Sequence, residues 1–219
     1  MMSTFIFFLV KEEPNCKQPM DVGFLIDSSA SMYGDYPSQL TFVQDMAKTL
    51  NVSQGGVHAS VIIYSHSAGV PVRLSEGTSL ADFTKAMQKV PFMGRDTRLD
   101  RGLYKSRLAL LDTKFGAREK LPKMLFVITD GEQSEPQFSH SPKNMAKALQ
   151  DLGVHVVAIG VGGAANKKQL REISSPKVDP YLVDSFDELL EDSFMEQLLK
   201  DNCRHLSECH YSILDFKYL

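Results

Sequence analysis

The sequence predicts an α/β fold with a mostly parallel central sheet flanked by helices. Three observations lead to this prediction. Short apolar runs rich in β-branched residues recur along the 219 residues. Segments with apolar residues at helical spacing separate these runs. The two kinds of segment alternate over most of the chain, which is typical of parallel strands joined through helices. The length allows one large domain with a core of its own.

In the first half of the chain, strands and helices are expected to alternate from residue 21. The apolar run 21–26 predicts a first strand. A helix is expected over 38–50, where apolar residues recur every three or four positions. The β-branched segment 57–64 predicts a second strand, with 69–74 as a short hairpin partner. A short amphipathic helix is expected over 80–90.

The second half continues the same alternation. A longer helix is expected after Thr97, with Leu99, Leu103, Leu108 and Leu111 facing inward. Strands are then predicted over 123–129, 154–161 and 181–183, and helices over 142–152, 167–173 and 186–199. We expect one principal domain over 16–203, an N-terminal segment 1–15 and a C-terminal tail 204–219.

Composition and charge exclude two classes of protein. The formal net charge of −3 argues against nucleic-acid binding, which normally requires a basic excess. No apolar run approaches the ~20 residues that a membrane span requires. The apolar run 5–10 has no Lys or Arg before it, and Lys11-Glu12-Glu13 follows it in place of the small residues of a cleavage site, so a signal peptide is not established.

Cys16 precedes the first predicted strand, and Cys203 follows the last amphipathic segment. A disulfide between them would join the two ends of the domain and contribute about 5 kcal/mol of stability by the chain-entropy argument. It would also indicate an oxidising compartment. The alternative is two unrelated thiols. If the disulfide forms, Cys209 is the odd cysteine.

Polar residues with oxygen ligands lie at the ends of two predicted strands and in one loop. Asp27-Ser28-Ser29-Ala30-Ser31 follows the first strand, Thr129-Asp130-Gly131 lies at the end of the strand over 123–129, and Asp96-Thr97 precedes a helix. Open α/β sheets bind ligands outside the carboxyl ends of their strands. Carboxylates and hydroxyls suit a hard dication such as Mg²⁺, and Mn²⁺ accepts similar sites. The predicted ligands are Asp27, Ser29, Ser31, Thr97 and Asp130.

The balance of charged and neutral ligands bears on what this site does. Two carboxylates with three hydroxyls leave the ion electrophilic, so that it can accept an acidic group from a partner. Taken alone, the cluster at Asp27 also suits a helix N-cap. A phosphatase-like enzyme with Asp27 as nucleophile is a further alternative. Its haloacid-dehalogenase-like version needs a second acid two residues later, where this chain has Ser29.

On these three motifs, the chain from about residue 16 to residue 203 resembles a von Willebrand factor type A domain. The motifs match the metal-ion-dependent adhesion site of that family in type and order. The resemblance implies a doubly wound sheet and a non-catalytic site at which a Glu or Asp of the ligand completes the metal shell. It implies that Ser29, Ser31 and Thr97 bind the metal directly or nearly so, and that Asp27 and Asp130 bind it directly or through water. The flanking cysteines resemble those of the extracellular-matrix branch, which includes matrilins and collagen-associated A domains.

We therefore expect cation-dependent adhesion to an extracellular-matrix or cell-surface protein, such as a collagen-like one, and an extracellular location. The candidate ligand contacts are Tyr33, Tyr36, Arg98 and Gln133. Asn51-Val52-Ser53 is a glycosylation acceptor if the protein is secreted. The alternative is an intracellular scaffold of the same fold, which predicts reduced cysteines and no glycan on Asn51.

Overall fold

The computed structural model describes residues 18–131 and 140–214, and it confirms the predicted α/β class. A six-stranded sheet has the strand order β3-β2-β1-β4-β5-β6, and only β3 pairs antiparallel to its neighbour. The strands are β1 (Met20–Asp27), β2 (Val57–Tyr64), β3 (Ala68–Val72), β4 (Lys123–Thr129), β5 (Val154–Val161) and β6 (Tyr181–Val183). The helices are α1 (Tyr36–Thr49), α2 (Leu80–Met87), α3 (Leu99–Leu111), α4 (Pro142–Asp151), α5 (Lys167–Ile173), α6 (Phe186–Leu189) and α7 (Asp192–Leu214), with 3-10 turns η1 (Ala30–Tyr33) and η2 (Thr113–Phe115).

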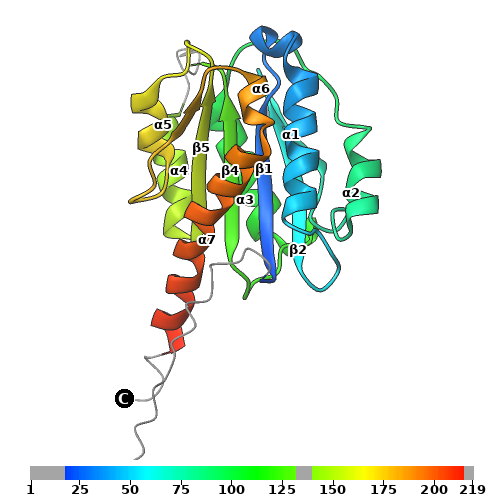
Figure 1. The fold of residues 1–219 in the computed structure, drawn as a ribbon, viewed down its shortest axis with the longest axis vertical. Helices are drawn as coiled ribbons and strands as arrows, with labels where there is room; N and C mark the ends of the chain where they lie inside the picture. The colour runs from blue at the N-terminus through cyan, green and yellow to red at the C-terminus, as the bar shows by residue number, and fades with distance from the viewer. Residues whose placement is uncertain (1–17, 132–139, 215–219) are drawn as a thin grey trace, which may run out of the picture.

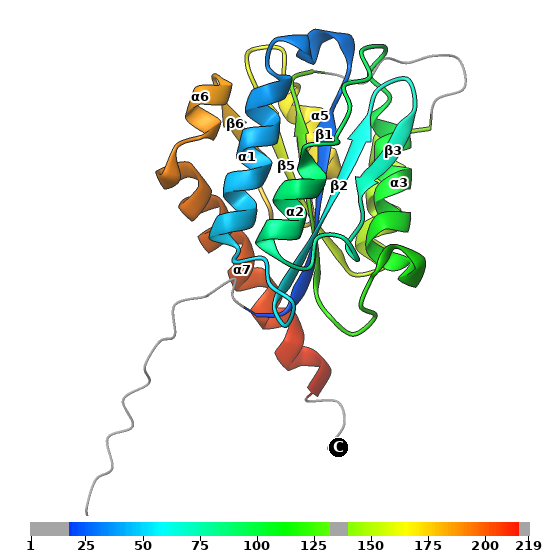
Figure 2. The same cartoon turned by 90° about the vertical axis from the view of Figure 1, so that its right-hand side faces the viewer.

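The sheet separates two layers of helices. In Figure 1, α1 and α7 lie in front of the sheet and α3 lies behind it. Figure 2 shows α1, α2, α6 and α7 on one side and α3 on the other. Alternate residues of one strand serve the two cores, since Phe24 packs with the α1 layer and Leu25 with the α3 layer. The central strands are buried on both faces, which explains their continuous apolar sequences.

The strand order places the ends of β1 and β4 at a switch point. The chain proceeds outward from β1 through β2 to β3, and then outward on the other side from β4 through β5 to β6. The ends of β1 and β4 are therefore neighbours at the point where the strand order reverses, which is where open α/β sheets bind ligands. Both strand ends lie at the upper edge of the sheet in Figure 1. This is the edge to which the sequence assigned the metal ligands.

A buried ion cluster stabilises the opposite edge. The carboxylate of Asp21, with no exposed surface, accepts hydrogen bonds from Arg118 Nε at 2.7 Å and Lys123 Nζ at 3.0 Å. Arg118 also donates to the carbonyl of Gly56 at 3.0 Å. The cluster links the start of β1 to the segment before β4. The sequence pattern gave no indication of it, because Asp21 lies within an otherwise apolar strand.

The C-terminal helix differs from the prediction. The structure breaks the expected helix 186–199 into α6 and α7, and α7 continues past residue 203 to Leu214. At about 100° per residue, Phe186 would lie opposite Met195 on an unbroken helix, and Leu189 would lie about 120° from it. All three side chains are buried. The break allows both groups to face the core, and the predicted boundary at 203 falls inside α7.

The inward face of α3 also differs in part. Leu99 and Leu103 are buried as expected, whereas Leu108 and Leu111 are only half-buried. Ser106 and Leu110 take the inward positions further along the helix. Within the two described ranges, no helix has the length and apolar character needed to cross a membrane.

Candidate metal centre

The centre of the site is a row of three side chains at the ends of adjacent strands. The register pairs Asp27 of β1 with Tyr64 of β2 and, one residue beyond Ile26 and Ile128, places Asp27 beside Thr129 of β4. Residues in register on parallel strands project from the same face of the sheet. Tyr64 and Thr129 accordingly both donate to Oδ2 of Asp27, at 2.8 and 3.1 Å.

Asp27 is fully buried, and neutral donors surround its carboxylate. Besides the two hydroxyls on Oδ2, the amide of Ser29 donates to Oδ1 at 2.8 Å. Burial raises the pKa of Asp27 above its ordinary value, against the hydrogen bonds from Ser29 and Tyr64, and the charge of Asp130 raises it further. Among the described residues, no lysine or arginine forms an ion pair with Asp27. A cation at this place would relieve the cost of the buried charge.

The hydroxyls of Ser29 and Ser31 face each other across the loop after β1, with their Oγ atoms 3.1 Å apart. Ser29 is buried whereas Ser31 is exposed, so the pair extends from the sheet edge to the surface. Ser28 holds the loop in place, because its Oγ accepts the amide of Met93 at 2.7 Å and its carbonyl accepts the amide of Gly94 at 2.8 Å.

The loop that carries Thr97 is tied to the same edge on both sides. Before Thr97, the amide of Ala30 donates to the carbonyl of Arg95 at 2.9 Å. After Thr97, the amide of Arg98 donates to the carbonyl of Ser65 at 3.1 Å. Thr97 itself is half-buried. These bonds bring the second predicted segment against the first.

Asp130 brings the third segment to the site. It follows Thr129 directly and is half-buried, and its charge contributes to raising the pKa of both Asp27 and Tyr64. The described residues contain no cluster of three or more His, Cys, Asp and Glu side chains suited to a metal. Two carboxylates with neighbouring hydroxyls fit a hard cation with oxygen ligands better than a soft one.

Three further residues support the site and were not predicted. Tyr64 is fully buried, which raises its pKa well above the ordinary value and keeps its phenol a donor to Asp27. Gln39 of α1 is buried and donates from Nε2 to the carbonyl of Asp27 at 2.8 Å. Gly102 lets α3 approach the sheet, since a Cβ there would lie 2.9 Å from Leu25 Cδ1 and 3.0 Å from Tyr64 Cβ.

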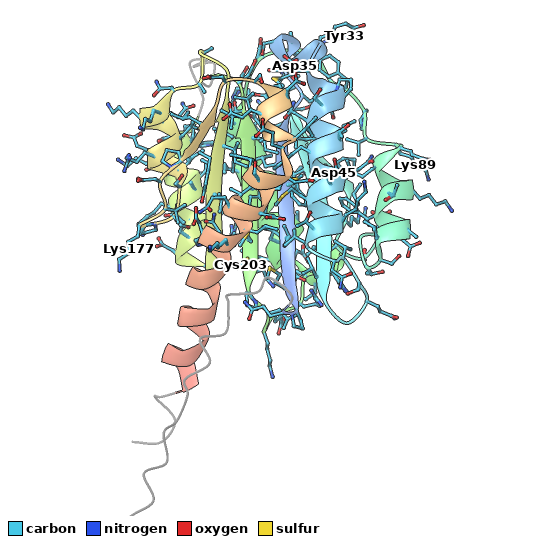
Figure 3. All side chains as sticks on the ribbon, viewed as in Figure 1. Tyr33, Asp35, Asp45, Lys89, Lys177 and Cys203 are labelled. Carbon is cyan, nitrogen blue, oxygen red and sulfur yellow. The ribbon has the colours of Figure 1, made fainter. Side chains whose placement is uncertain are left out.

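The four candidate ligand contacts have different positions. Tyr33 is 78% exposed at the carboxyl edge and packs edge-on against Phe92 with ring centroids 5.6 Å apart (Figure 3). The expectation for Tyr36 is corrected, because it is only 5% exposed and its hydroxyl donates to the carbonyl of Pro91 at 2.8 Å.

Arg98 is likewise not a free residue at the rim of the site. It is 8% exposed, and its Nε and Nη2 donate to the two carboxylate oxygens of Asp100 at 2.8 and 2.7 Å. Burial alone would raise the pKa of Asp100, but the hydrogen bonds from Arg98 and from the amide of His140 lower it below its ordinary value. The pair is held together inside the fold, which corrects the expectation of a ligand contact. Gln133 lies outside the described residues.

Two covalent expectations concern the ends of the domain and one loop. Cys203 is disulfide-bonded. Its predicted partner Cys16 lies outside the described residues, so the pairing stays a prediction. Asn51 is exposed just after α1 and has a φ of 54°, a left-handed conformation that Asn tolerates well. Its glycosylation also stays a prediction.

Comparison with known proteins agrees with the family resemblance drawn from the sequence. The sequence profile of the von Willebrand factor type A domain matches residues 21–196. Cuticlin-6 of Caenorhabditis elegans is 31% identical over 84% of this chain, and matrilin-1 of Gallus gallus is 30% identical over 73%. The chain spans only 32% and 31% of these two proteins.

A collagen alpha-4(VI) chain of Mus musculus is 29% identical over 84% of this chain, which spans 7% of that protein. Among solved structures, proximal thread matrix protein 1 of the mussel byssus superposes with a TM-score of 0.75 at 29% identity, covering 86% of this chain and 47% of its own. Another structure of that protein has zinc in its metal-ion-dependent adhesion site (MIDAS) motif.

Proposed function

Because the chain belongs to the von Willebrand factor type A domain family, whose members similar to it include matrix proteins, we propose that it is a divalent-cation-dependent protein-binding module. In this proposal an acidic residue of the partner completes the shell of a metal ion at the carboxyl edge of the sheet. The metal ligands are Asp27, Ser29, Ser31, Thr97 and Asp130.

One observation carries the proposal. Three segments distant in the sequence meet at the switch point of the sheet, and their carboxylates and hydroxyls extend from the buried Asp27 to the exposed Ser31. This change from buried to exposed oxygens supports a metal that is held by protein oxygens on its buried side and is open to a partner on its solvent side. When bound, the ion supplies an electrophilic centre that attracts a partner carboxylate. The chain's own residues orient the ligands and exclude water beneath them.

The proposed ion is Mg²⁺, with Mn²⁺ as a substitute. Neutral hydroxyls and carboxylates are hard oxygen ligands, which Mg²⁺ prefers, and Mn²⁺ accepts the same set. The zinc in the mussel protein supports a divalent ion at the corresponding motif of that protein.

The proposed setting is extracellular, with a matrix or cell-surface protein, for example a collagen-like one, as partner. The similarity to matrilin-1 and collagen VI supports this setting, as does the disulfide at Cys203, since disulfides persist in oxidising compartments. The proposed role is binding and not catalysis. The one candidate nucleophile, Asp27, is buried and its carboxylate accepts three hydrogen bonds.

A surface-binding experiment tests this function. The chain is passed over immobilised collagen and matrix glycoproteins in Mg²⁺ and again in chelator, as wild type, Thr97→Ala and Thr113→Ala. Thr113 is an exposed threonine in η2, so it serves as the matched control. We expect binding that chelator and Thr97→Ala abolish and that Thr113→Ala leaves intact. Binding that persists in chelator contradicts the metal-dependent mechanism, and no binding to any matrix protein contradicts the proposed partner class.

A further inference from the structure

A second concave site lies beside α3, next to the loop that carries Thr97. The pocket has a volume of about 560 Å³. Its walls come from the turn before β3, from α3 and from the start of α4. The lining residues that carry its chemistry are Ser67, Arg98, Asp100, Arg101, Tyr104 and Lys105. None of the five predicted metal ligands lines it.

The pocket has an excess of positive charge. Asp100 is the only acid among the described residues of its lining, and Arg98 already engages both of its carboxylate oxygens. Arg101 and Lys105 remain, and in the described part of the chain neither forms an ion pair with a carboxylate. The chain as a whole is acidic, with a net charge of −3, so this local excess runs against the average. The charge selects an anionic ligand.

An aromatic ring lines the same pocket as the two cations. Tyr104 is 54% exposed and belongs to the pocket lining. Tyr104 and Lys105 follow Arg101 by three and four positions, so each is its neighbour on the surface of α3, and all three line the pocket. The flat ring of Tyr104 offers an apolar surface on which a ligand can stack. The nearby cations can pair with charged groups at the edge of that ligand.

The surrounding backbone argues against a peptide ligand that extends the sheet. In the turn before β3, the carbonyl of His66 accepts from Arg101, and the carbonyl of Ser67 accepts the amide of Ser65 at 2.8 Å. Each of these two acceptors therefore already has one hydrogen bond within the fold. The groups left for recognition are cationic and hydroxyl side chains around an aromatic ring. Such groups match a ligand with a flat apolar face, many hydroxyls and charged substituents.

We infer that this pocket binds a sulfated polysaccharide chain, with a sugar ring on Tyr104 and its sulfates on Arg101 and Lys105, independently of the metal. The C–H face of a sugar ring is apolar and stacks on an aromatic ring, while its sulfates point outward to the cations. The binding goes beyond the proposed adhesion through the metal, since it uses a different set of residues.

The test measures binding of a fluorescent heparin-derived tetrasaccharide to the full chain in chelator. The wild type binds in a saturable manner. Arg101→Gln/Lys105→Gln weakens binding by about tenfold, because it removes two charge contacts. The matched control is Lys85→Gln/Lys89→Gln, which makes the same change of net charge on the opposite layer, near α2 (Figure 3), and leaves the affinity within about twofold of wild type.

Two single variants separate contact from folding. Arg101 also binds the carbonyl of His66, so Lys105→Glu and Tyr104→Ala are measured alongside, with thermal melts of each. We expect both variants to weaken binding of the tetrasaccharide without lowering the melting temperature of the protein. The inference would be overturned if the two double variants lost affinity equally, or if the wild type did not bind in chelator. It would also be overturned if a hexaglutamate peptide bound more strongly than the tetrasaccharide. Chelator removes the metal-dependent adhesion, so failure of one proposal is distinguishable from failure of the other.

Discussion

Replacing Tyr64 by Phe isolates the contribution of one hydroxyl to the metal site. The ring is fully buried, and Phe preserves its packing. The only atom lost is the oxygen that donates to Oδ2 of Asp27 at 2.8 Å. The substitution therefore acts on the Asp27 carboxylate only through this hydrogen bond and replaces none of the predicted ligands. It asks whether the row of side chains across the strand ends sets the metal affinity.

The remaining contacts set the size of the expected effect. Asp27 keeps the donor of Thr129 at 3.1 Å and the amide of Ser29 at 2.8 Å, so two of three hydrogen bonds survive. A hydrogen bond to a charged group contributes about 1.5–3 kcal/mol. Loss at the lower end of that range weakens the binding of Mg²⁺ by about tenfold, which is also the lower end for groups that orient metal ligands.

The effect has a pH dependence with a defined sign. The hydrogen bond from Tyr64 lowers the pKa of Asp27, which burial has raised above its ordinary value. Removing it raises that pKa further, so protons compete better with the metal for the carboxylate. The affinity lost in Tyr64→Phe should therefore be greater near about pH 6 than near about pH 8.

Calorimetric titration of Mg²⁺ at both pH values measures these quantities. Tyr181→Phe is the matched control, because its hydroxyl donates at 3.0 Å to Asp201 and belongs to the packing of α7. We expect the control to bind like the wild type. The claim that the hydrogen bond from Tyr64 to Asp27 sets the metal affinity is refuted if Tyr64→Phe also binds like the wild type at both pH values. It is equally refuted if the two variants lose the same affinity.

Three other substitutions test the fold around the site. In chelator, Asp27→Asn should raise the melting temperature near neutral pH, because burial makes the ionised carboxylate unfavourable. This gain in melting temperature should shrink at lower pH, where the Asp27 carboxylate of the wild type becomes protonated. A gain that does not change with pH would contradict this reasoning. Asp21→Ala leaves the buried Lys123 and the partly buried Arg118 without their carboxylate and should lower the free energy of unfolding in urea by about 3–5 kcal/mol. A loss below about 1 kcal/mol would show that water compensates. Gly102→Ala forces a methyl against Leu25 and Tyr64 and should destabilise by about 1–3 kcal/mol while weakening Mg²⁺ binding; unchanged melts and affinity would mean that α3 shifts freely.

Much of the fold could be predicted because the sheet is buried on both faces. The segments that form β2, β4 and β5 are continuous apolar runs that end at polar or turn residues, so their observed bounds match the predicted ones. The helix ends were less accurate, and the split between α6 and α7 was missed. That split follows from the angular positions of Phe186 and Met195, which a count of apolar residues does not reveal.

The site was predictable to the extent that its residue types follow strand ends. Asp27 and Asp130 each come at or just after the end of a buried run, and the structure brings their segments together with Thr97. The roles of Tyr64 and Gln39 depend on register across strands and on the contact of α1 with β1. Neither role can be predicted from the local sequence. The opposite environments of Tyr33 and Tyr36 likewise depend on how η1 turns after the first motif.

The direct test of the central claim is a calorimetric titration of Mg²⁺ into the wild type and into folded Asp27→Ala and Thr97→Ala. The two residues come from different segments, so they test the convergence and not only one motif. We predict saturable binding by the wild type that both substitutions abolish, with Mn²⁺ giving the same pattern. A folded wild type that binds neither ion at millimolar concentration, or variants that bind as well as it does, would contradict a metal centre at this edge of the sheet.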